Sequence, residues 1–310
     1  MEKRLEKVPE SNSWTNIRKI KEGFDECTKY CFVKDGQKFI IKIFPKKGLE
    51  KKEREFCILQ RIQDIDFNKP KPITMGKIDE DNYYYILTWV EGKTLTEFAA
   101  GKSEEQLYEI GKKVGEIMHK IHEEKFDNKD LRNKIDKIRN KIPLFRKLNV
   151  DYAETVINFL ENNIEKLEQQ PKSIVHGDLN QDNIIIDEKG NIGIIDFGNS
   201  DIDYSYQDTH QIQMYNRFLS KGLSAGVIDG YLQGKDNQTF WESYKIYSAY
   251  YCLSKIIWAY KFKDAALIKD MLRRAKQTVE DFDYFRSDKP IWYEEYKRKN
   301  LKKGEYEERQ

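Results

Sequence analysis

The chain has 310 residues, and its 55 lysines and arginines nearly balance its 53 aspartates and glutamates, which leaves a formal net charge of +2. This length allows one large domain or two smaller lobes. Apolar residues make up 39% and aromatic residues 13%, so the composition excludes a wholly disordered chain. The balanced charge gives no argument for a nucleic-acid partner.

The hydropathy and the cysteines predict a cytoplasmic protein with no membrane partner. No apolar run reaches the roughly 18 residues that a membrane helix needs. The N-terminal residues MEKRLEKVPE are charged throughout and lack the apolar core of a signal peptide. We expect reduced thiols without a metal-ligand pattern at the four cysteines, Cys27, Cys31, Cys57 and Cys252.

The N-terminal region predicts a small sheet with one helix. Short apolar runs at residues 29–33 and 38–44 flank Asp35-Gly36, which is typical of a hairpin turn. Residues 49–62 then carry apolar side chains at helical spacing. A stretch broken by prolines separates this helix from a strand-like run over residues 83–90.

The pattern becomes mainly helical further along the chain. Ser103 and Gln106 form a capping-box pattern in front of an amphipathic face. Two short strands are expected at residues 183–187 and 191–196, and residues 209–285 are again mainly helical.

These patterns divide the chain into two parts. Residues 1–91 predict an N-terminal lobe of sheet and helix, and residues 92–310 predict a larger helical lobe. The polar residues from Lys297 onwards predict a frayed tail.

The motif that carries chemistry lies between residues 174 and 208. It contains a His-Gly-Asp triplet ending at Asp178, then Asn183, and then Asp-Phe-Gly beginning at Asp196. Amide and carboxylate oxygens are ligands that Mg²⁺ prefers, and a hairpin can bring Asn183 and Asp196 side by side. Asp178 stands on the loop before the hairpin, where it can orient or accept the proton of an attacking hydroxyl. The spacing therefore predicts phosphoryl transfer, with Asp178 as the catalytic group and the other two as metal ligands.

One lysine, Lys42, interrupts an otherwise apolar strand. A buried charge is costly unless it is paired, so Lys42 needs a carboxylate partner. Glu55 on the following helix is the expected partner, and Glu53 is the alternative. In protein kinases such a lysine holds nucleotide phosphates and pairs with a helix glutamate, so we expect Lys42 and Glu55 to bind the nucleotide.

The same set of loop aspartate, asparagine and Asp-Phe-Gly occurs in protein kinases. The form His-Gly-Asp-Leu with Ile-Asp-Phe-Gly, however, resembles the aminoglycoside phosphotransferase family, which shares the kinase fold. Gly23-Phe24-Asp25 is similar to the nucleotide loop of the aminoglycoside 2''-phosphotransferases. The resemblance extends over residues 20–260 and is dense over residues 174–208. It implies a two-lobed, protein-kinase-like fold of the α+β class, with a small antiparallel-sheet N-lobe and a larger, mainly helical C-lobe.

The resemblance also implies how the nucleotide is held. In the family, the backbone of a linker between the lobes hydrogen-bonds the edge of the base, which by position indicates Thr88 to Val90. Ile185 and Ile195, beside the metal ligands, would form the apolar floor under the base. Backbone recognition leaves little trace in side chains, so ATP and GTP both stay open as the donor, with Mg²⁺ as the cofactor.

The acceptor is expected to be a cationic small molecule. No Ala-Pro-Glu triplet follows Asp196 and the glycine pattern is incomplete, which argues against a protein kinase. Residues 187–208 hold six acidic side chains against one lysine, a surplus that favours a polyamine, although a solvated acidic loop is the alternative. Asp201 and Asp208 are the candidate contacts, and in the family the aspartate at position 208 usually supports the active-site loop. Other candidates without a distinguishing spacing are Asp229, Trp241, Glu242 and Trp258.

The four histidines are not assigned to catalysis. His119, His122 and His210 show no metal-ligand spacing and are expected to be structural or on the surface. His176 belongs to the catalytic loop, where we expect it to hold the loop by packing and hydrogen bonding and not to act as the base.

The sequence thus predicts a monomeric kinase that transfers the γ-phosphate of a Mg-nucleotide to a hydroxyl of an aminoglycoside, which would confer antibiotic resistance. The fold by itself cannot specify the acceptor, so a housekeeping metabolite kinase or a macrolide kinase stays open. A non-catalytic binding protein on the kinase fold is the other alternative. It is disfavoured because a scaffold has no chemical need for Lys42, Asp178, Asn183 and Asp196 together.

Overall fold

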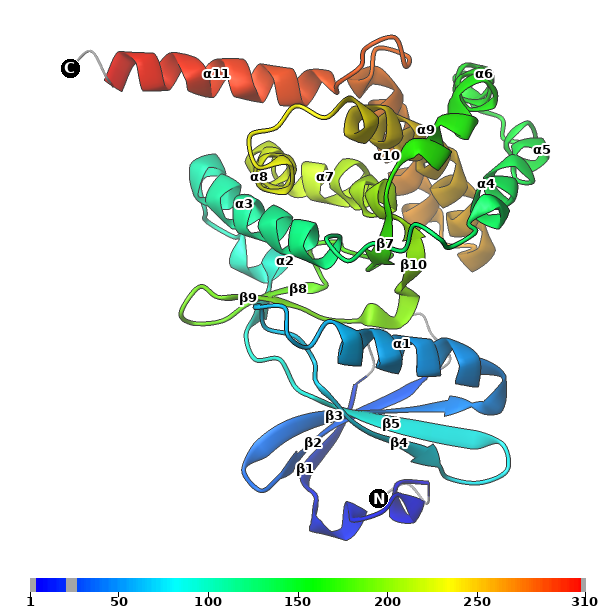
Figure 1. Cartoon of the computed structure of the whole chain (residues 1–310), viewed down its shortest axis with the longest axis vertical. Coiled ribbons are helices and arrows are strands. Elements are labelled where there is room, and N and C mark those ends of the chain that lie inside the picture. Colours follow the sequence, from blue (N-terminus) through cyan, green and yellow to red (C-terminus); the bar gives the residue numbers. More distant parts are fainter. Residues whose placement is uncertain (1–3, 21–26, 308–310) are drawn as a thin grey trace. The chain divides into compact units, whose positions relative to one another are not determined.

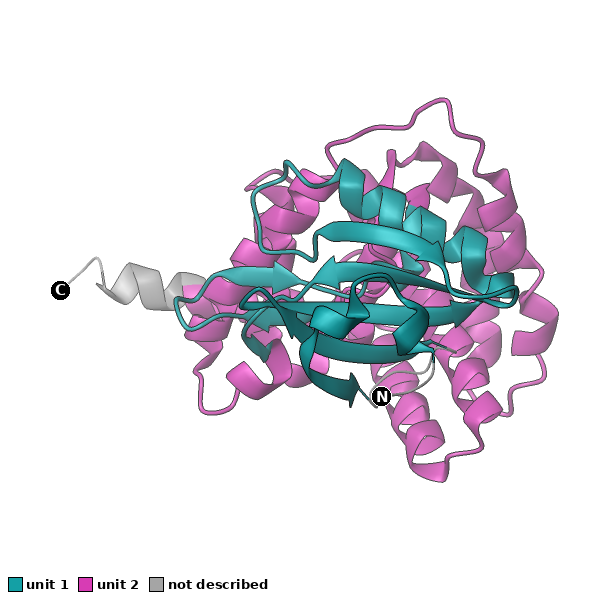
Figure 2. Cartoon of the chain, turned by 90° about the horizontal axis from the view of Figure 1, so that it is seen from below, with its two compact units in different colours: residues 1–94, 183–201 teal, residues 95–182, 202–310 magenta. Residues whose placement is uncertain are grey.

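The computed structural model describes residues 4–20 and 27–307, with side chains up to residue 300. The chain forms two compact units, which Figure 2 shows in teal and magenta. The first unit contains residues 1–94 and 183–201, and the second contains residues 95–182 and 202–310. The division therefore differs from the one expected at residue 91, because the segment with both predicted metal ligands belongs to the first unit.

The first unit is built on a five-stranded antiparallel sheet with the order β1-β2-β3-β5-β4. Its strands are β1 (Thr15–Ile20), β2 (Thr28–Lys34), β3 (Gln37–Pro45), β4 (Pro72–Lys77) and β5 (Asn82–Thr88), and its helix is α1 (Leu49–Arg61). The predicted hairpin is confirmed: Asp35 and Gly36 have φ values of 50° and 76°, as a type I′ turn requires. The two edge strands, β1 and β4, were not predicted because their mostly exposed side chains leave no apolar pattern.

Strand β3 is apolar on both sides because both faces of the sheet are covered. Ile41 and Ile43 point to one face, where they join a buried cluster with the N-terminal residues Leu5, Val8 and Trp14. Side chains alternate along a strand, so Lys42 points to the opposite face. Helix α1 covers that face (Figure 1) and contributes Glu55, which meets Lys42 there.

A second, three-stranded sheet in the first unit contains β6 (Lys93–Thr94), β8 (Ile184–Ile186) and β9 (Ile192–Ile194). The pairing of β6 with β8 explains why residues 183–201 join this unit. Gly92 precedes β6 with a φ of 137°, and a Cβ at this position would lie 2.5 Å from the carbonyl oxygen of Ile186. Only glycine allows the two backbones to approach so closely.

The second unit is mainly helical and also contains a two-stranded sheet of β7 (Lys172–Val175) and β10 (Asp201–Tyr204). Its helices are α2 (Leu95–Phe98), α3 (Glu104–Ile121), α4 (Arg132–Arg139), α5 (Ile142–Phe145), α6 (Ala153–Asn163), α7 (Arg217–Leu219), α8 (Lys221–Leu232), α9 (Gln238–Phe262), α10 (Ala265–Asp281) and α11 (Ile291–Glu307), with a π-helical turn at Ile212–Asn216. Among the residues described, none of these helices has the length and apolarity to span a membrane.

Two helix ends in the second unit test the sequence predictions. The capping box of α3 is confirmed, because Ser103 and Gln106 exchange hydrogen bonds between side chain and backbone at 3.2 and 3.0 Å. The frayed tail expected from Lys297 is wrong, since α11 continues to Glu307. Helix α11 is anchored in its second turn by an ion pair of 2.6 Å between Lys297 Nζ and Asp229 Oδ2.

Helices α3 and α8 are packed backbone to backbone (Figure 1). Glycines make this contact possible on both helices, because a Cβ on any of them would lie 2.0–2.2 Å from a backbone oxygen of the other helix. They are Gly111 and Gly115 on α3, and Gly222, Gly226 and Gly230 on α8.

We predict that Gly226→Ala destabilises the chain. The added Cβ would lie 2.1 Å from the carbonyl oxygen of Tyr108, so the two helices would have to separate. Overpacking of this kind costs about 3 kcal/mol in the free energy of unfolding, measurable by urea denaturation. Gly48→Ala is the matched control, because its Cβ would make an ordinary contact of 3.7 Å, and its effect should stay within about 0.5 kcal/mol. Equal stability of the two variants would contradict the prediction.

Candidate active site

Lys42 is a buried ammonium held between two carboxylates of the first unit. Its Nζ lies 3.0 Å from Glu55 Oε1 and 3.1 Å from Asp196 Oδ1. The side chains of Lys42 and Glu55 are 5% and 1% exposed. Of the two glutamates considered as partners, Glu55 therefore makes the pair, while Glu53 is exposed on the other side of the helix.

A second lysine, Lys52, completes this group, and the sequence analysis missed it. Its Nζ lies 3.0 Å from Glu55 Oε2, so each oxygen of this carboxylate has its own ammonium. Burial alone would lower the pKa of Lys42, but the charges around it, Glu55 first, hold that pKa well above its usual value. Burial alone would raise the pKa of Glu55, but Lys42 and Lys52 hold it below its usual value. The i, i+3 spacing of Lys52 and Glu55 was the available signal.

The two predicted metal ligands stand together at the open end of the β8–β9 hairpin. The carbonyl oxygen of Asn183 accepts a hydrogen bond of 2.9 Å from the amide of Ile195, which places Asn183 beside the residue before Asp196. Asp196 adopts a left-handed conformation with φ 60° and ψ 62°, which is uncommon outside glycine and is found at functional sites. One amide oxygen and one carboxylate fit Mg²⁺, which takes few protein ligands and keeps phosphates and waters for the rest.

Asp178, in the second unit, has its carboxylate oriented by two amides. Its Oδ1 accepts hydrogen bonds from Asn180 Nδ2 at 3.1 Å and from Gln211 Nε2 at 3.0 Å. Its backbone amide donates to His176 Nδ1 at 3.2 Å, so His176 holds the loop, as expected. Asp178 is half-buried, which leaves it accessible to a ligand.

Asp208 supports the loop that carries Asp178. Its carboxylate accepts hydrogen bonds of 2.7 Å from the amides of both His176 and Gly177, and His122 Nε2 lies 3.3 Å away. The side chain is 1% exposed. Burial alone would raise the pKa of Asp208, but the hydrogen bond and charge of His122 hold it below its usual value. The expectation that Asp208 contacts the substrate is therefore corrected, because its carboxylate is buried and committed to the loop.

Three more acidic side chains of residues 187–208 also have partners. Asp201 pairs with Arg54 at 3.8 Å and Asp203 pairs with Lys134 at 2.9 Å. Asp187 caps its own turn by accepting from the amides of Lys189 and Asn191. Most of the acidic surplus of this segment thus serves turns, ion pairs and the loop, while Glu188 is exposed.

His210 determines the orientation of Gln211. Its Nδ1 lies 2.6 Å from the carbonyl oxygen of Gln207, which only accepts, so Nδ1 carries the hydrogen and Nε2 carries a lone pair. Gln211 Nε2, at 2.9 Å, donates to this lone pair and gives its second hydrogen to Asp178. Burial first, and then the charge of Lys255, lowers the pKa of His210 to about 3, so the ring is neutral. Gln211 had no signal in the sequence, because only the folded helices bring it to Asp178.

The predicted base-binding linker lines a cavity of about 710 Å³ in the first unit, with Thr88 and Val90 in its wall. The amide of Thr88 already donates to the carbonyl oxygen of Lys71 at 2.9 Å, so base recognition by this amide would require that bond to break. Ile185 is 6% exposed and Ile195 is half-buried. The nucleotide-loop residues Gly23-Phe24-Asp25 lie outside the described residues.

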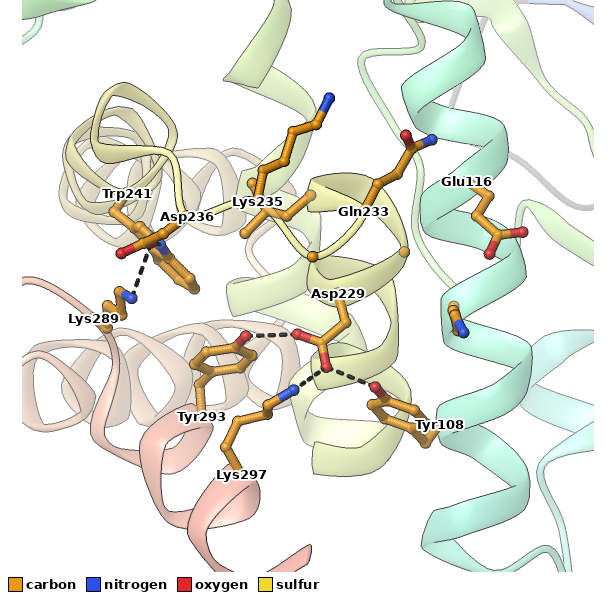
Figure 3. Close-up of a pocket in the computed structure, with 14 residues that line it drawn as sticks. Tyr108, Glu116, Asp229, Gln233, Lys235, Asp236, Trp241, Lys289, Tyr293 and Lys297 are labelled. Atoms are coloured by element: carbon orange, nitrogen blue, oxygen red, sulfur yellow. Dashed lines mark hydrogen bonds and ion pairs between the residues drawn. The ribbon is translucent and has the colours of Figure 1, made fainter. Parts of the chain in front are cut away.

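Two further candidates, Asp229 and Trp241, line a cavity of about 740 Å³ in the second unit (Figure 3). The carboxylate of Asp229 accepts from three groups, each at 2.6 Å: the hydroxyls of Tyr108 and Tyr293 and the ammonium of Lys297. Asp229 therefore joins α3, α8 and α11, and this structural role explains why a carboxylate stands at this position. Glu242 lines a separate cavity of about 390 Å³.

We predict a pH-dependent cost for Asp208→Asn. The pKa of Asp208 is lowered in the folded chain, so its ionised form stabilises the fold above about pH 4, and this contribution is lost as the pH falls through the folded-state pKa. Urea denaturation should place the variant about 3 kcal/mol below the parent at pH 7, with a gap that narrows below about pH 4. Asp288→Asn, at an exposed carboxylate, is the control, and its free energy of unfolding should equal that of the parent at both pH values. A gap of equal size at pH 7 and pH 3 would refute the linkage.

Comparisons with known proteins bear on the family and the fold of the chain. The model of the phosphotransferase enzyme family matches residues 16–247. Apo APH(4)-Ia, an aminoglycoside phosphotransferase solved as a thermostable mutant, is 14% identical with a TM-score of 0.68, covering 90% of this chain and 98% of its own. ADP-bound APH(2'')-Ib is 19% identical with a TM-score of 0.66, and the coverage is again 90% and 98%. No curated protein matches the chain in sequence.

These likenesses confirm the fold that the sequence predicts, a kinase-like α+β fold with an antiparallel sheet near the N-terminus and a helical C-terminal part. The family model covers more than half of the residues. The chain is thus a phosphotransferase with an alcohol group as acceptor, and it belongs to the phosphotransferase enzyme family.

Proposed function

We propose that the chain transfers the γ-phosphoryl group of a Mg²⁺-bound nucleoside triphosphate to a hydroxyl of a small molecule. The hydroxyl oxygen forms the new bond to phosphorus, the bond to the β–γ bridging oxygen breaks, and a nucleoside diphosphate leaves. The hydroxyl proton passes to the carboxylate of Asp178. The observation that carries the proposal is the buried Lys42 group, because a buried ion group adds little to stability compared with apolar residues of similar volume.

In this proposal, Lys42 binds the α- and β-phosphates and Glu55 holds its ammonium in place. Lys52 keeps Glu55 ionised, which in turn keeps Lys42 aligned. Asn183 and Asp196 would hold Mg²⁺, which supplies neutralisation of the phosphate charge when it is bound.

Asp178 orients the acceptor hydroxyl and accepts its proton. Both amide donors, Asn180 and Gln211, contact Oδ1 of this carboxylate, so its plane is held by bonds on one side. A carboxylate in a single orientation supports proton transfer, because the hydroxyl must approach within hydrogen-bond reach.

Two acceptor classes are open. An aminoglycoside acceptor, and with it antibiotic resistance, is supported by similar folds solved with hygromycin B and with kanamycin, at 14% and 17% identity. Another small-molecule alcohol is favoured by the engaged carboxylates of residues 187–208, which leave little negative charge for a polyamine. The donor can be ATP or GTP, since those folds were solved with ADP and with GDP.

The direct test is release of nucleoside diphosphate from MgATP and MgGTP, with aminoglycosides, macrolides, choline and homoserine as acceptors, and mass spectrometry of the products. We expect Asp178→Asn to lower kcat about 1,000-fold, with little change in the KM of the nucleotide, because the proton acceptor is lost. Asp182→Asn, on the same loop and bonded to Thr96, is the matched control and should keep activity. Full activity of Asp178→Asn would exclude the proposed role.

Gln211 gives a second test of the same reaction. Gln211→Ala removes one of two donors to Asp178, so kcat should fall about 10-fold while the KM of the nucleotide stays unchanged. Gln211→Glu places a like charge beside Asp178, so its kcat should fall further than that of Gln211→Ala. Steady-state kinetics and urea denaturation of both variants check this prediction. A loss of kcat that only follows a loss of folding stability, or a change in the nucleotide KM alone, would mean that Gln211 does not position Asp178.

A further inference from the structure

A lysine of α9, Lys255, stands in a cage of aromatic rings in the second unit. Its Nζ lies 5.1 Å from the ring centroid of Tyr215, 5.5 Å from that of Trp258 and 6.0 Å from that of Tyr251. Lys255 and all three rings are half-buried, so the cage is reachable from solvent.

The rings stabilise the positive charge but do not satisfy the ammonium. An ammonium carries three N–H donors, whereas a ring face contributes about 0.5–1 kcal/mol and no lone pair. Across the described residues, Lys255 makes no hydrogen bond or ion pair with a carboxylate, unlike Lys42 and Lys52. Because the cage is reachable from solvent, water supplies the acceptors that the chain does not, and an anion from outside the chain can replace that water with a charge-assisted contact.

Contacts link this cage to the catalytic carboxylate. The ring of Tyr251 stacks on that of His210, with centroids 3.5 Å apart and an angle of 11°. His210 in turn accepts a hydrogen bond from Gln211, which donates to Asp178. The charge of Lys255 contributes to the low pKa of His210, so it acts within this layer of side chains.

The surface beside the cage is also positive. Arg274 stacks on the ring of Tyr215 at 5.4 Å, and both Arg274 and Arg273 bond to the one carboxylate of Asp270 at 2.7 Å. In the described part of the chain, Lys255 and these two arginines bring three positive charges to this surface, and the two arginines share the carboxylate of Asp270. Such a surface attracts an anionic ligand and repels a polyamine.

We infer that Lys255 and its aromatic cage form a subsite for an anionic group, a carboxylate or a phosphate, on the acceptor. This rests on the proposed function: the acceptor presents its hydroxyl to Asp178 and its anionic group to Lys255, while the rings contact its carbon skeleton. The acceptor class is therefore a hydroxy acid or a sugar phosphate, and not a polycationic aminoglycoside.

The test compares acceptors by charge on the full chain with MgATP and MgGTP. The four arms are hydroxy acids such as glycerate, sugar phosphates such as glucose 6-phosphate, neutral sugars such as glucose, and aminoglycosides such as kanamycin. We expect an anionic acceptor to have the highest kcat/KM, and the first two arms separate carboxylate from phosphate. A highest kcat/KM for a neutral or polycationic acceptor would overturn the inference.

Variants at Lys255 show whether this residue binds the anionic group of the acceptor. Lys255→Met keeps the length of the side chain and should raise the KM of the anionic acceptor about 10–100-fold, with kcat and nucleotide KM nearly unchanged. Lys255→Arg should retain most of the affinity. Lys261→Met, at an exposed lysine of the same helix, is the control. An unchanged acceptor KM in Lys255→Met would exclude the subsite.

A binding measurement separates this inference from the proposed function. The chain loaded with a non-hydrolysable nucleotide is tested for thermal stabilisation by sodium phosphate and sodium glycerate, against sodium chloride at equal ionic strength. Stabilisation that disappears in Lys255→Met supports the subsite even if no acceptor is phosphorylated, in which case the proposed function alone fails. No stabilisation by either anion, together with no turnover of anionic acceptors, overturns the subsite.

Discussion

The ammonium of Lys42 is the charge on which the architecture of the first unit depends. A lysine that is 5% exposed requires carboxylates at hydrogen-bond distance, and the fold supplies one from α1 and one from the end of the β8–β9 hairpin. The N-terminal segment covers one face of strand β3, and α1, which carries Glu55, covers the face of Lys42. The left-handed backbone of Asp196 directs its carboxylate to the same ammonium. A buried ion group of this kind adds little net stability to a fold. Its presence here therefore favours a functional reason for the buried charges.

The second unit uses a buried carboxylate to hold a loop. Asp208 accepts from two successive backbone amides, so the loop before Asp178 has a defined path that side-chain packing alone would not enforce. His122 connects Asp208 to α3 and, through a contact of 3.0 Å with the hydroxyl of Tyr231, to α8. The glycines that bring α3 and α8 together therefore also position the catalytic loop.

The charges of the residues proposed to bind the nucleotide are arranged differently from those near Asp178, where the acceptor is proposed to bind. The groups proposed to bind the nucleotide form a closed set in which each carboxylate oxygen of Glu55 has a lysine. The contacts of Asp178 include the neutral amides of Asn180 and Gln211, and the contacts of Gln211 lead through His210 and Tyr251 to Lys255, which has no carboxylate partner within the described residues. This pattern of charges is the basis for the inferred negative charge of the acceptor. The fold that the chain shares with distant aminoglycoside phosphotransferases does not by itself define the acceptor.

Much of the fold and the motif was predictable because it rests on local rules. The Asp-Gly hairpin, the capping box of α3 and the pairing of Lys42 with Glu55 follow from turn geometry, helix termini and the cost of an unpaired buried charge. The edge strands β1 and β4 were not predictable, since their mostly exposed side chains leave no apolar pattern. The helical continuation of α11 was also missed, because its anchor at Asp229 lies far away in sequence.

The sequence by itself predicted the reaction class: the spacing of Asp178, Asn183 and Asp196, with Lys42 upstream, indicates phosphoryl transfer, and the family match confirms a phosphotransferase. Tertiary structure decided which of the many charges are free to act. Composition shows six acidic residues between residues 187 and 208, but only the fold shows that Asp201, Asp203 and Asp208 are already paired. Likewise, only packing brings Gln211 to Asp178 and surrounds Lys255 with rings. The physical reason is that hydrogen bonds and ion pairs depend on distances between atoms, which for residues far apart in the chain are defined only when the helices pack.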